Sequence, residues 1–511
     1  MAFTELITEN TGAFFMFVVT LVVILLYQNA KRPTGFPPGP PALPILGNVF
    51  TFRSSEPPYR IFLRLAEKYG RIFSLKLGSF WVIVLNDIED VREALVKQAV
   101  DFAGRPDLYT TRMFTEGFQD IAFSDYSPEW QLHRRIGHAA LRHFARGEKL
   151  DKLVHSALPG IAKVLDKSAG QPFDLKDVID RAIYIVLANM CYGKRHDFDD
   201  PFLTKWFASN KKALALLGAG LPRDFIHGLR YLPLSTREKR MTELSEEGLQ
   251  FVYDEFKGHR DTFDPDNIRD LFDSLIAAQK EDAAEGRSTA EFLTDTRVIQ
   301  TVADLFGAGT GTTIPTLYWA VALMIEHPPI LERVTKEIDE VIGQDRLPCL
   351  SDRGSMPYTE AVLMEVNRYG VVVPVGLPKS VTRDTTFRGF KIPKDTMLMV
   401  NVWAVHYNPE HWDEPSKFKP ERFLDESGTK LVKPPPSYMP FGMGRRACIG
   451  ENFAKGEIFL VFCWLFGRYT FAKPVTRGES LLKLDDTTGL NHEPSPYQVI
   501  VTKKVSDKVE D

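Results

Sequence analysis

The sequence has no excess of basic residues, few cysteines and no flexible linker after its first fifty residues. Its 63 lysines and arginines stand against 67 acidic residues, and duplex nucleic acid needs a basic surface, so we expect no nucleic-acid binding. Four widely spaced cysteines in 511 residues form no disulfide framework, which indicates a reducing compartment. Because no low-complexity stretch divides the chain, we predict one large folded domain.

A long uncharged segment lies near the amino terminus. No charge occurs from Thr11 to Ala30, and this length approaches the roughly 20 apolar residues that cross a bilayer. Acidic residues precede it and no small-residue cleavage pattern follows, which favours a retained anchor over a cleaved signal. Lys31 and Arg32 close the segment and predict that the rest of the chain is cytoplasmic. We therefore predict a single membrane anchor over residues 1–32.

The remaining chain reads as a stiff arm followed by a mainly helical domain. Prolines crowd residues 33–48 and exclude both helix and central strand, which predicts a hinge. Residues 49–511 follow as the large domain, which we expect to be mainly α with small β-sheets (α+β). The expected elements are a hairpin of 72–77 and 81–85, helices from about 128 to 369, short strands near 382–401, a helix over about 449–466 and a strand over 497–503.

A glycine-rich loop, Phe441 to Gly450 (FGMGRRACIG), delivers one cysteine to the start of an apolar helix. A helix N-terminus stabilises a thiolate, which is the form of cysteine that binds metal. Glycines let the loop approach a flat cofactor such as haem, Phe441 can shield the sulfur, and Arg446 can meet a haem propionate. A buried structural cysteine is the alternative. The spacing favours Cys448 as an iron ligand.

This loop resembles the Phe-x-x-Gly-x-Arg-x-Cys-x-Gly signature of the cytochrome P450 haem-thiolate monooxygenases, and four further motifs follow in the family's order. The resemblance covers nearly the whole chain and is closest to the animal microsomal branch with steroid 17-alpha-hydroxylases and aromatic-hydrocarbon hydroxylases. It implies a cytochrome P450 fold with an N-terminal transmembrane helix and haem b bound through Cys448. Residues 49–511 would then form the haem-binding catalytic domain.

Two of these motifs are implied to support the haem loop. Glu365 and Arg368 have an i,i+3 spacing that places both on one helix face, which alone describes an ordinary surface pair. In the resembled family, an arginine at the place of Arg422, in Phe418-Lys419-Pro420-Glu421-Arg422-Phe423, joins such a pair as a buried clamp.

Two more positions are implied to contact the haem propionates. Trp130 and Arg134 are an i,i+4 helical pair whose indole N–H and guanidinium can both donate hydrogen bonds. A core tryptophan beside a solvated arginine is the alternative. Lys379 occupies a place where relatives often carry histidine or arginine, and it is a weaker candidate for the same role.

The last motif lies in a predicted long helix over residues 294–326. Gly307 to Thr313 resembles the family's Ala-Gly-x-(Asp/Glu)-Thr-(Thr/Ser), in which a threonine supports oxygen activation, and this assigns Thr312 as catalytic. The expected acid is replaced by Gly311. Asp304 cannot substitute directly, because eight residues place it about 12 Å away along the axis.

Three functions follow from these motifs. The first is a monooxygenase that hydroxylates a lipophilic, steroid-like or other hydrophobic molecule with O2 and electrons from NADPH. The second is a reductase-independent enzyme that isomerises or dehydrates a peroxide, which Gly311 favours because no external proton is then required. The third is a non-enzymatic haem-binding sensor.

The microsomal resemblance also implies partners, a location and candidate substrate contacts. NADPH-cytochrome P450 reductase is the expected electron donor, with cytochrome b5 as a second candidate partner. The chain would be a single-pass protein of the endoplasmic reticulum membrane, with its catalytic domain on the cytoplasmic side. The candidate substrate contacts are Asn210, Phe306, Ala308, Gly309 and Val373.

Overall fold

The structure is a computed structural model that describes residues 2–53, 55–168, 170–193, 197–200, 207–209, 212, 220–285, 292–474 and 491–504. It divides into two compact units, each built from separated stretches of chain. The first unit comprises Met1–Tyr109, Leu221–Pro233 and Pro378–Asn401, and the second comprises Thr110–Gly220, Leu234–Leu377 and Val402–Asp511.

The first unit is built around a four-stranded sheet in the order β1-β2-β7-β4. β1 (Ile72–Leu77) and β2 (Phe80–Leu85) form the predicted antiparallel hairpin, and Leu77 lies opposite Phe80. Gly78 allows this tight turn because its φ of 56° lies in the left-handed region. β7 (Met397–Val400) pairs with β2 in parallel, and β4 (Lys379–Ser380) pairs with β7 antiparallel.

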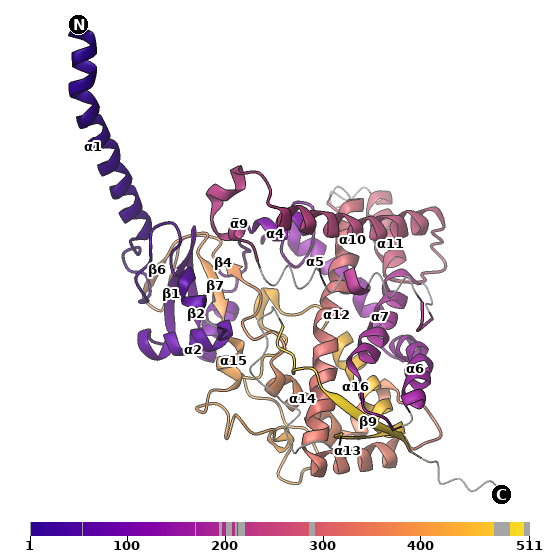
Figure 1. Ribbon diagram of the computed structural model, residues 1–511. Helices are drawn as coiled ribbons and strands as arrows, with labels where there is room; N and C mark the ends of the chain where they lie inside the picture. The colour runs from indigo at the N-terminus through magenta and orange to yellow at the C-terminus, as the bar shows by residue number, and fades with distance from the viewer. Residues whose placement is uncertain are drawn as a thin grey trace, which may run out of the picture. The chain divides into compact units, whose positions relative to one another are not determined.

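The helix α1 (Ala2–Ala30) opens the first unit (Figure 1). Its large apolar side chains, such as Phe14, Phe17 and Leu25, are exposed. Within the described residues, no helix combines the length and the apolar character that crossing a membrane requires. The other elements of this unit are η1 (Val49–Phe52), α2 (Pro58–Tyr69), α3 (Ile88–Arg92), η2 (Glu93–Lys97), α9 (Pro222–Phe225), η3 (His227–Tyr231), β5 (Thr385–Phe387) and β6 (Phe390–Ile392).

The second unit is mainly helical, as predicted, with one small sheet in the order β3-β9-β8. Its strands are β3 (Phe173–Asp174), β8 (Tyr469–Ala472) and β9 (Gln498–Lys503). Its α-helices are α4 (Tyr109–Phe114, whose first residue belongs to the other unit), α5 (Pro128–Phe144), α6 (Glu148–Ser168), α7 (Lys176–Tyr192), α10 (Thr236–Asp261), α11 (Leu271–Ala284), α12 (Asp295–Glu326), α13 (Pro328–Val341), α14 (Pro357–Gly370), α15 (Val402–His406) and α16 (Glu451–Arg468). Its 3-10 turns are η5 (Leu350–Ser355), η6 (Pro420–Phe423) and η7 (Gly444–Arg446).

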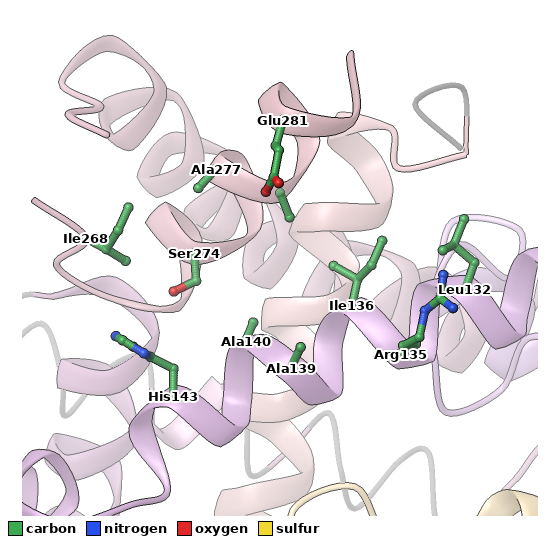
Figure 2. Close-up of a pocket in the computed structure, with 11 residues that line it drawn as sticks. Leu132, Arg135, Ile136, Ala139, Ala140, His143, Ile268, Ser274, Ala277 and Glu281 are labelled. Carbon is green, nitrogen blue, oxygen red and sulfur yellow. The ribbon is translucent and has the colours of Figure 1, made fainter. Parts of the chain in front are cut away.

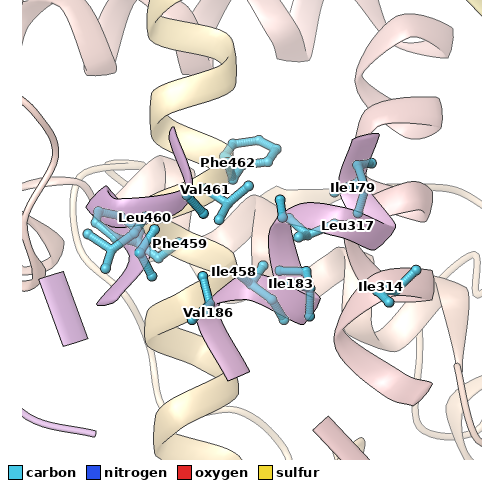
Figure 3. Close-up of a cluster of buried hydrophobic side chains, with 14 of the residues drawn as sticks. Ile179, Ile183, Val186, Ile314, Leu317, Ile458, Phe459, Leu460, Val461 and Phe462 are labelled. Atoms are coloured by element: carbon cyan, nitrogen blue, oxygen red, sulfur yellow. The ribbon is translucent and has the colours of Figure 1, made fainter. Parts of the chain in front are cut away.

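Three helices form the centre of the second unit's core. Ile183 of α7, Leu317 of α12 and Phe462 of α16 are buried in one cluster, and Figure 3 shows side chains from these helices together. Each such side chain contributes roughly 1.5–3 kcal/mol when it leaves water. This packing holds α16 against the core that contains α12, and the cysteine loop leads directly into α16.

Candidate active site

The cysteine loop places Cys448 just ahead of α16. Gly442 and Gly444 adopt φ angles of 68° and 74°, which glycine accepts without strain. The Cys448 N–H donates to the Phe441 carbonyl at 2.8 Å, which closes the loop. The side chain of Cys448 is accessible to solvent although protein atoms crowd around it. The loop therefore presents one reachable sulfur at a helix N-terminus.

The electrostatics at the sulfur differ from the sequence expectation. Burial raises the pKa of the Cys448 thiol, and the N–H group of Gly450 and the Arg134 guanidinium oppose this rise. The N–H groups at the helix N-terminus therefore lower the pKa of the thiol, as predicted, but burial raises this pKa by more. A metal cation offsets such a rise, because a coordinating thiol is deprotonated outright. A single accessible thiol with directed N–H groups and glycines at the close approach fits haem.

Three predicted cofactor residues gather around this loop. The Arg446 guanidinium stacks 3.8 Å from the centre of the Trp130 ring, and the Arg134 guanidinium lies 5.5 Å from the same ring. Arg134 donates to the carbonyl of Ala447, next to the cysteine. The buried indole of Trp130 donates to the Ile121 carbonyl at 2.9 Å. In this structure these donors therefore bond to backbone carbonyls, one of which, that of Ala447, belongs to the cysteine loop.

Lys379 lies in the first unit, where it begins β4 and pairs with Leu398 of β7. Its proposed contact with the cofactor of the second unit stays a prediction.

Glu365, Arg368 and Arg422 form one buried cluster. Arg368 binds both oxygens of Glu365 at 2.7 Å, and neither side chain has any exposed surface. Arg422 adds a third bond to Glu365 at 3.2 Å. The remaining N–H groups of Arg368 donate to carbonyls at His406 and Pro415. His406 in turn accepts the N–H of Met439, close to the start of the cysteine loop.

A mainly apolar cavity of about 290 Å³ lies beside α12. Phe306, Ala308, Thr312 and Val373 line it, and their substrate or catalytic roles stay predictions. Gly309 is not among its lining residues. A Cβ at Gly309 would come within 2.9 Å of Leu187 of α7, so this glycine permits close helix packing, and its contact with substrate stays a prediction. Asn210 lies outside the described residues.

Thr312 lies within the cavity wall beside the glycine that replaces the expected acid. Its hydroxyl donates to the Ala308 carbonyl at 3.0 Å, the back-bonding typical of helical threonines. Asn491 donates to the Gly311 carbonyl and also lines the cavity. Sequence reasoning missed Asn491, because nothing in its local pattern links it to a helix 180 residues earlier in the chain.

A larger groove of about 650 Å³ lies between α5 and α11 (Figure 2). Ile136 and Ala140 of α5 face Ala277 of α11 across it, with Arg135 and Glu281 also lining it. We assign the substrate site to the smaller cavity, because only that cavity contains Thr312 and residues of the predicted site.

Comparisons with known proteins identify the family to which the chain is similar. A sequence profile of the cytochrome P450 family matches residues 37–501. Steroid 17-alpha-hydroxylase/17,20 lyase of Ictalurus punctatus is 33% identical over 499 residues, with 96% of each chain covered. Cytochrome P450 1A1 of Limanda limanda is 36% identical, with 89% of each chain covered. A solved zebra fish cytochrome P450 with progesterone has a TM-score of 0.78 and 36% identity, covering 88% of this chain and 100% of that one.

Proposed function

Because the chain belongs to the cytochrome P450 family of haem-thiolate monooxygenases, we propose that it hydroxylates a lipophilic, steroid-like molecule with electrons that a reductase draws from NADPH. One observation carries the proposal. An accessible thiol at the N-terminus of α16 occurs in the same unit as an apolar cavity that contains Thr312.

Cys448 would hold haem b through its sulfur, with Phe441 beside it. Trp130, Arg134 and Arg446 would meet the propionates, and Lys379 is a further candidate for this contact. A thiolate-bound haem iron supplies the activation of O2 and the transfer of one oxygen atom to the substrate. The buried Glu365 cluster positions the chain that leads into the cysteine loop.

Thr312 would hold a proton at its hydroxyl near the reacting oxygen. General acid assistance is typically worth about 10²–10⁴ in rate, and Gly311 provides none. The proton would therefore reach Thr312 through water rather than from a neighbouring carboxyl.

The substrate cavity supports a hydrophobic substrate of steroid-like size. Phe306 and Val373 supply apolar walls, while Ala308 leaves room above the helix. Gly309 would act indirectly by letting α12 approach α7. Asn210 stays a candidate contact for a polar end of the substrate. Steroid hydroxylases among the relatives and the progesterone in the zebra fish structure favour this class.

A basic group on α5 and its surroundings would dock the electron donor. NADPH-cytochrome P450 reductase is the proposed partner, with cytochrome b5 as a second. The docking residues would be Arg135, Arg142, Arg146, Lys149 and Arg445. We further propose that α1 attaches the protein to the endoplasmic reticulum membrane as a single-pass anchor, with the catalytic domain in the cytoplasm. The exposed apolar side chains of α1 support this attachment.

Reconstituted turnover tests the proposal directly. Purified protein with reductase, NADPH and a panel of steroids is expected to yield a hydroxylated product that disappears without reductase. Gly311 favours one alternative, the rearrangement of a ready-made peroxide. Turnover of a lipid hydroperoxide without reductase or NADPH, together with no product from the steroid panel, would replace the proposal with that alternative.

A further inference from the structure

The loop of residues 120–124 is held from the substrate side by an aspartate of α12. Asp304 accepts hydrogen bonds from the N–H groups of Ile121 at 2.8 Å and Ala122 at 3.1 Å. Asp304, Ala122 and Phe123 all line the apolar cavity. This carboxyl therefore fixes one wall of the proposed substrate site.

The same loop is held from the other side by the residues proposed to bind the cofactor. The Ile121 carbonyl accepts the Trp130 indole N–H at 2.9 Å and an Arg446 N–H at 3.3 Å. The Ser124 carbonyl accepts a second Arg446 N–H at 2.8 Å. Any shift of the loop therefore moves the cavity wall together with the partners of Trp130 and Arg446.

A fully buried carboxyl, that of Asp120, begins the loop. Asp120 has no exposed surface, and it accepts the Phe123 N–H at 2.6 Å. Burial, and then the charge of Asp120, raise the pKa of the Asp304 carboxyl well above its usual range. Two carboxyls that interact in a low-dielectric site do not ionise independently.

Other ionisable groups lie around the loop. His133 of α5 bonds to the Thr301 hydroxyl at 2.5 Å, and burial, with a smaller effect of Arg297, lowers the pKa of His133 to about 4. It is therefore neutral at neutral pH. Arg297 and Arg446 keep their charge throughout. Glu116, upstream of the loop, accepts hydrogen bonds from Gln300 and Tyr253.

We propose that Asp120 and Asp304 hold one proton between them, and that this proton keeps the loop of residues 120–124 in place. Loss of the proton sets two like charges against each other and loosens the loop. Substrate affinity and the hold on the cofactor residues then decline together as pH rises. Asp120 and Asp304 are positioning residues, and only the ligand-binding part of this inference rests on the proposed function.

The loop itself provides a test that needs no turnover. Hydrogen exchange at the Ile121, Ala122 and Phe123 amides, corrected for the intrinsic effect of pH, is expected to accelerate in the wild type as pH rises. Asp120→Asn removes one charge and keeps a hydrogen-bond acceptor, so exchange should stay slow at all pH values. Equal pH dependence of exchange in the wild type and in Asp120→Asn would overturn the proposal that a shared proton holds the loop.

Infrared spectroscopy provides a second, direct readout. At neutral pH the wild type is expected to show a protonated-carboxyl component, in addition to that of Glu457, and this component should be lost in Asp304→Asn. Asp125→Asn, at an exposed aspartate just beyond the loop, is the matched control and should keep the band. A spectrum without a band that depends on Asp304 or Asp120 would contradict the shared proton.

Ligand titration tests whether the shared proton affects the proposed substrate site. Progesterone affinity, read from the haem spectrum, should weaken with rising pH by up to about tenfold per pH unit in the wild type. In Asp120→Asn it should be nearly constant, and Asp125→Asn should follow the wild type. If the exchange and infrared results are as expected but progesterone gives no spectral response, the shared proton is supported and the proposed substrate class is wrong.

Discussion

Cys448 combines burial, which favours the neutral thiol, with two N–H groups and a guanidinium that favour the thiolate. Burial dominates in the protein chain alone. Thiolate formation is therefore coupled to metal binding, and the affinity of such a site depends on pH, because the ligand must lose its proton. The helix N-terminus alone does not set the charge of this cysteine.

Gly311 is the residue at which proton delivery can be changed. In Gly311→Glu, a carboxyl next to Thr312 is expected to raise the fraction of NADPH consumption that ends in hydroxylated product. The measurement compares NADPH oxidation with product formed in the reconstituted system. Gly311→Gln adds the same bulk without an acidic proton and should not improve this ratio. If Gly311→Glu shows unchanged or worse coupling, protons reach Thr312 adequately in the natural protein.

Glu457 of α16 is fully buried beside Thr313, and burial raises the pKa of its carboxyl to about 8. A carboxyl whose pKa rises on folding stabilises most below its unfolded pKa, and this contribution is lost as pH rises through the folded pKa. Between pH 5 and 8 the wild type should therefore lose about 1.4 kcal/mol per pH unit relative to Glu457→Gln. Denaturant unfolding of both proteins across this range measures the difference. If the free energies of unfolding of the wild type and of Glu457→Gln depend on pH in the same way, Glu457 is ionised in the folded protein.

At the scale of elements, the Glu365 cluster joins α14 to the chain that enters the cysteine loop. Glu365→Gln leaves two buried guanidinium groups without their carboxylate partner, and breaking a buried pair costs about 3–5 kcal/mol. We expect a drop of that size in the free energy of unfolding, together with weaker haem retention. Thermal and denaturant unfolding with haem absorbance provide both readouts.

The chain offers a matched control for this prediction. Arg240 and Glu243 of α10 have the same i,i+3 spacing, but their side chains are 59% and 58% exposed. Glu243→Gln should change stability by less than about 1 kcal/mol, because exposed pairs contribute little. Equal changes in the free energy of unfolding for Glu243→Gln and Glu365→Gln would mean that burial does not strengthen the Glu365 cluster.

Elements with a strong local pattern could be predicted from the sequence. The hairpin around Gly78 follows from apolar strands with a turn glycine, and the cysteine loop follows from its fixed spacing. Contacts between distant segments could not be predicted. Asp120 has no local feature that places it beside Asp304, and no local pattern places Asn491 at Gly311. The sequence predicts that Gly309 contacts substrate, but its close packing against Leu187 of α7 could not be predicted from the local pattern.

At the scale of the whole molecule, each unit is assembled from stretches far apart in the chain. Residues Leu221–Pro233 and Pro378–Asn401 complete the unit that begins with Met1–Tyr109. β7 pairs with β2 although more than 300 residues separate them, as in Val82 with Met397. Sequence periodicity reports the faces of single elements and carries no information on such pairings.

The attachment of the whole molecule to a membrane depends on α1 in our proposal. Deletion of residues 1–32 should release the protein from alkaline-extracted membranes, because the exposed apolar side chains of α1 are then removed. Fractionation followed by immunodetection measures this, with the full-length chain as control. A truncated protein that stays in the membrane pellet after alkaline extraction would refute the anchor.

Ligation of haem iron by Cys448 is the central claim, and the absorbance spectrum of the reduced, carbon monoxide-treated protein tests it most directly. We predict the red-shifted Soret band that a thiolate ligand produces. Cys448→Ala should abolish this band, while Cys349→Ala, at a partly exposed cysteine elsewhere, should retain it. A wild-type spectrum without the shift, or a shifted band that persists in Cys448→Ala, would contradict the account.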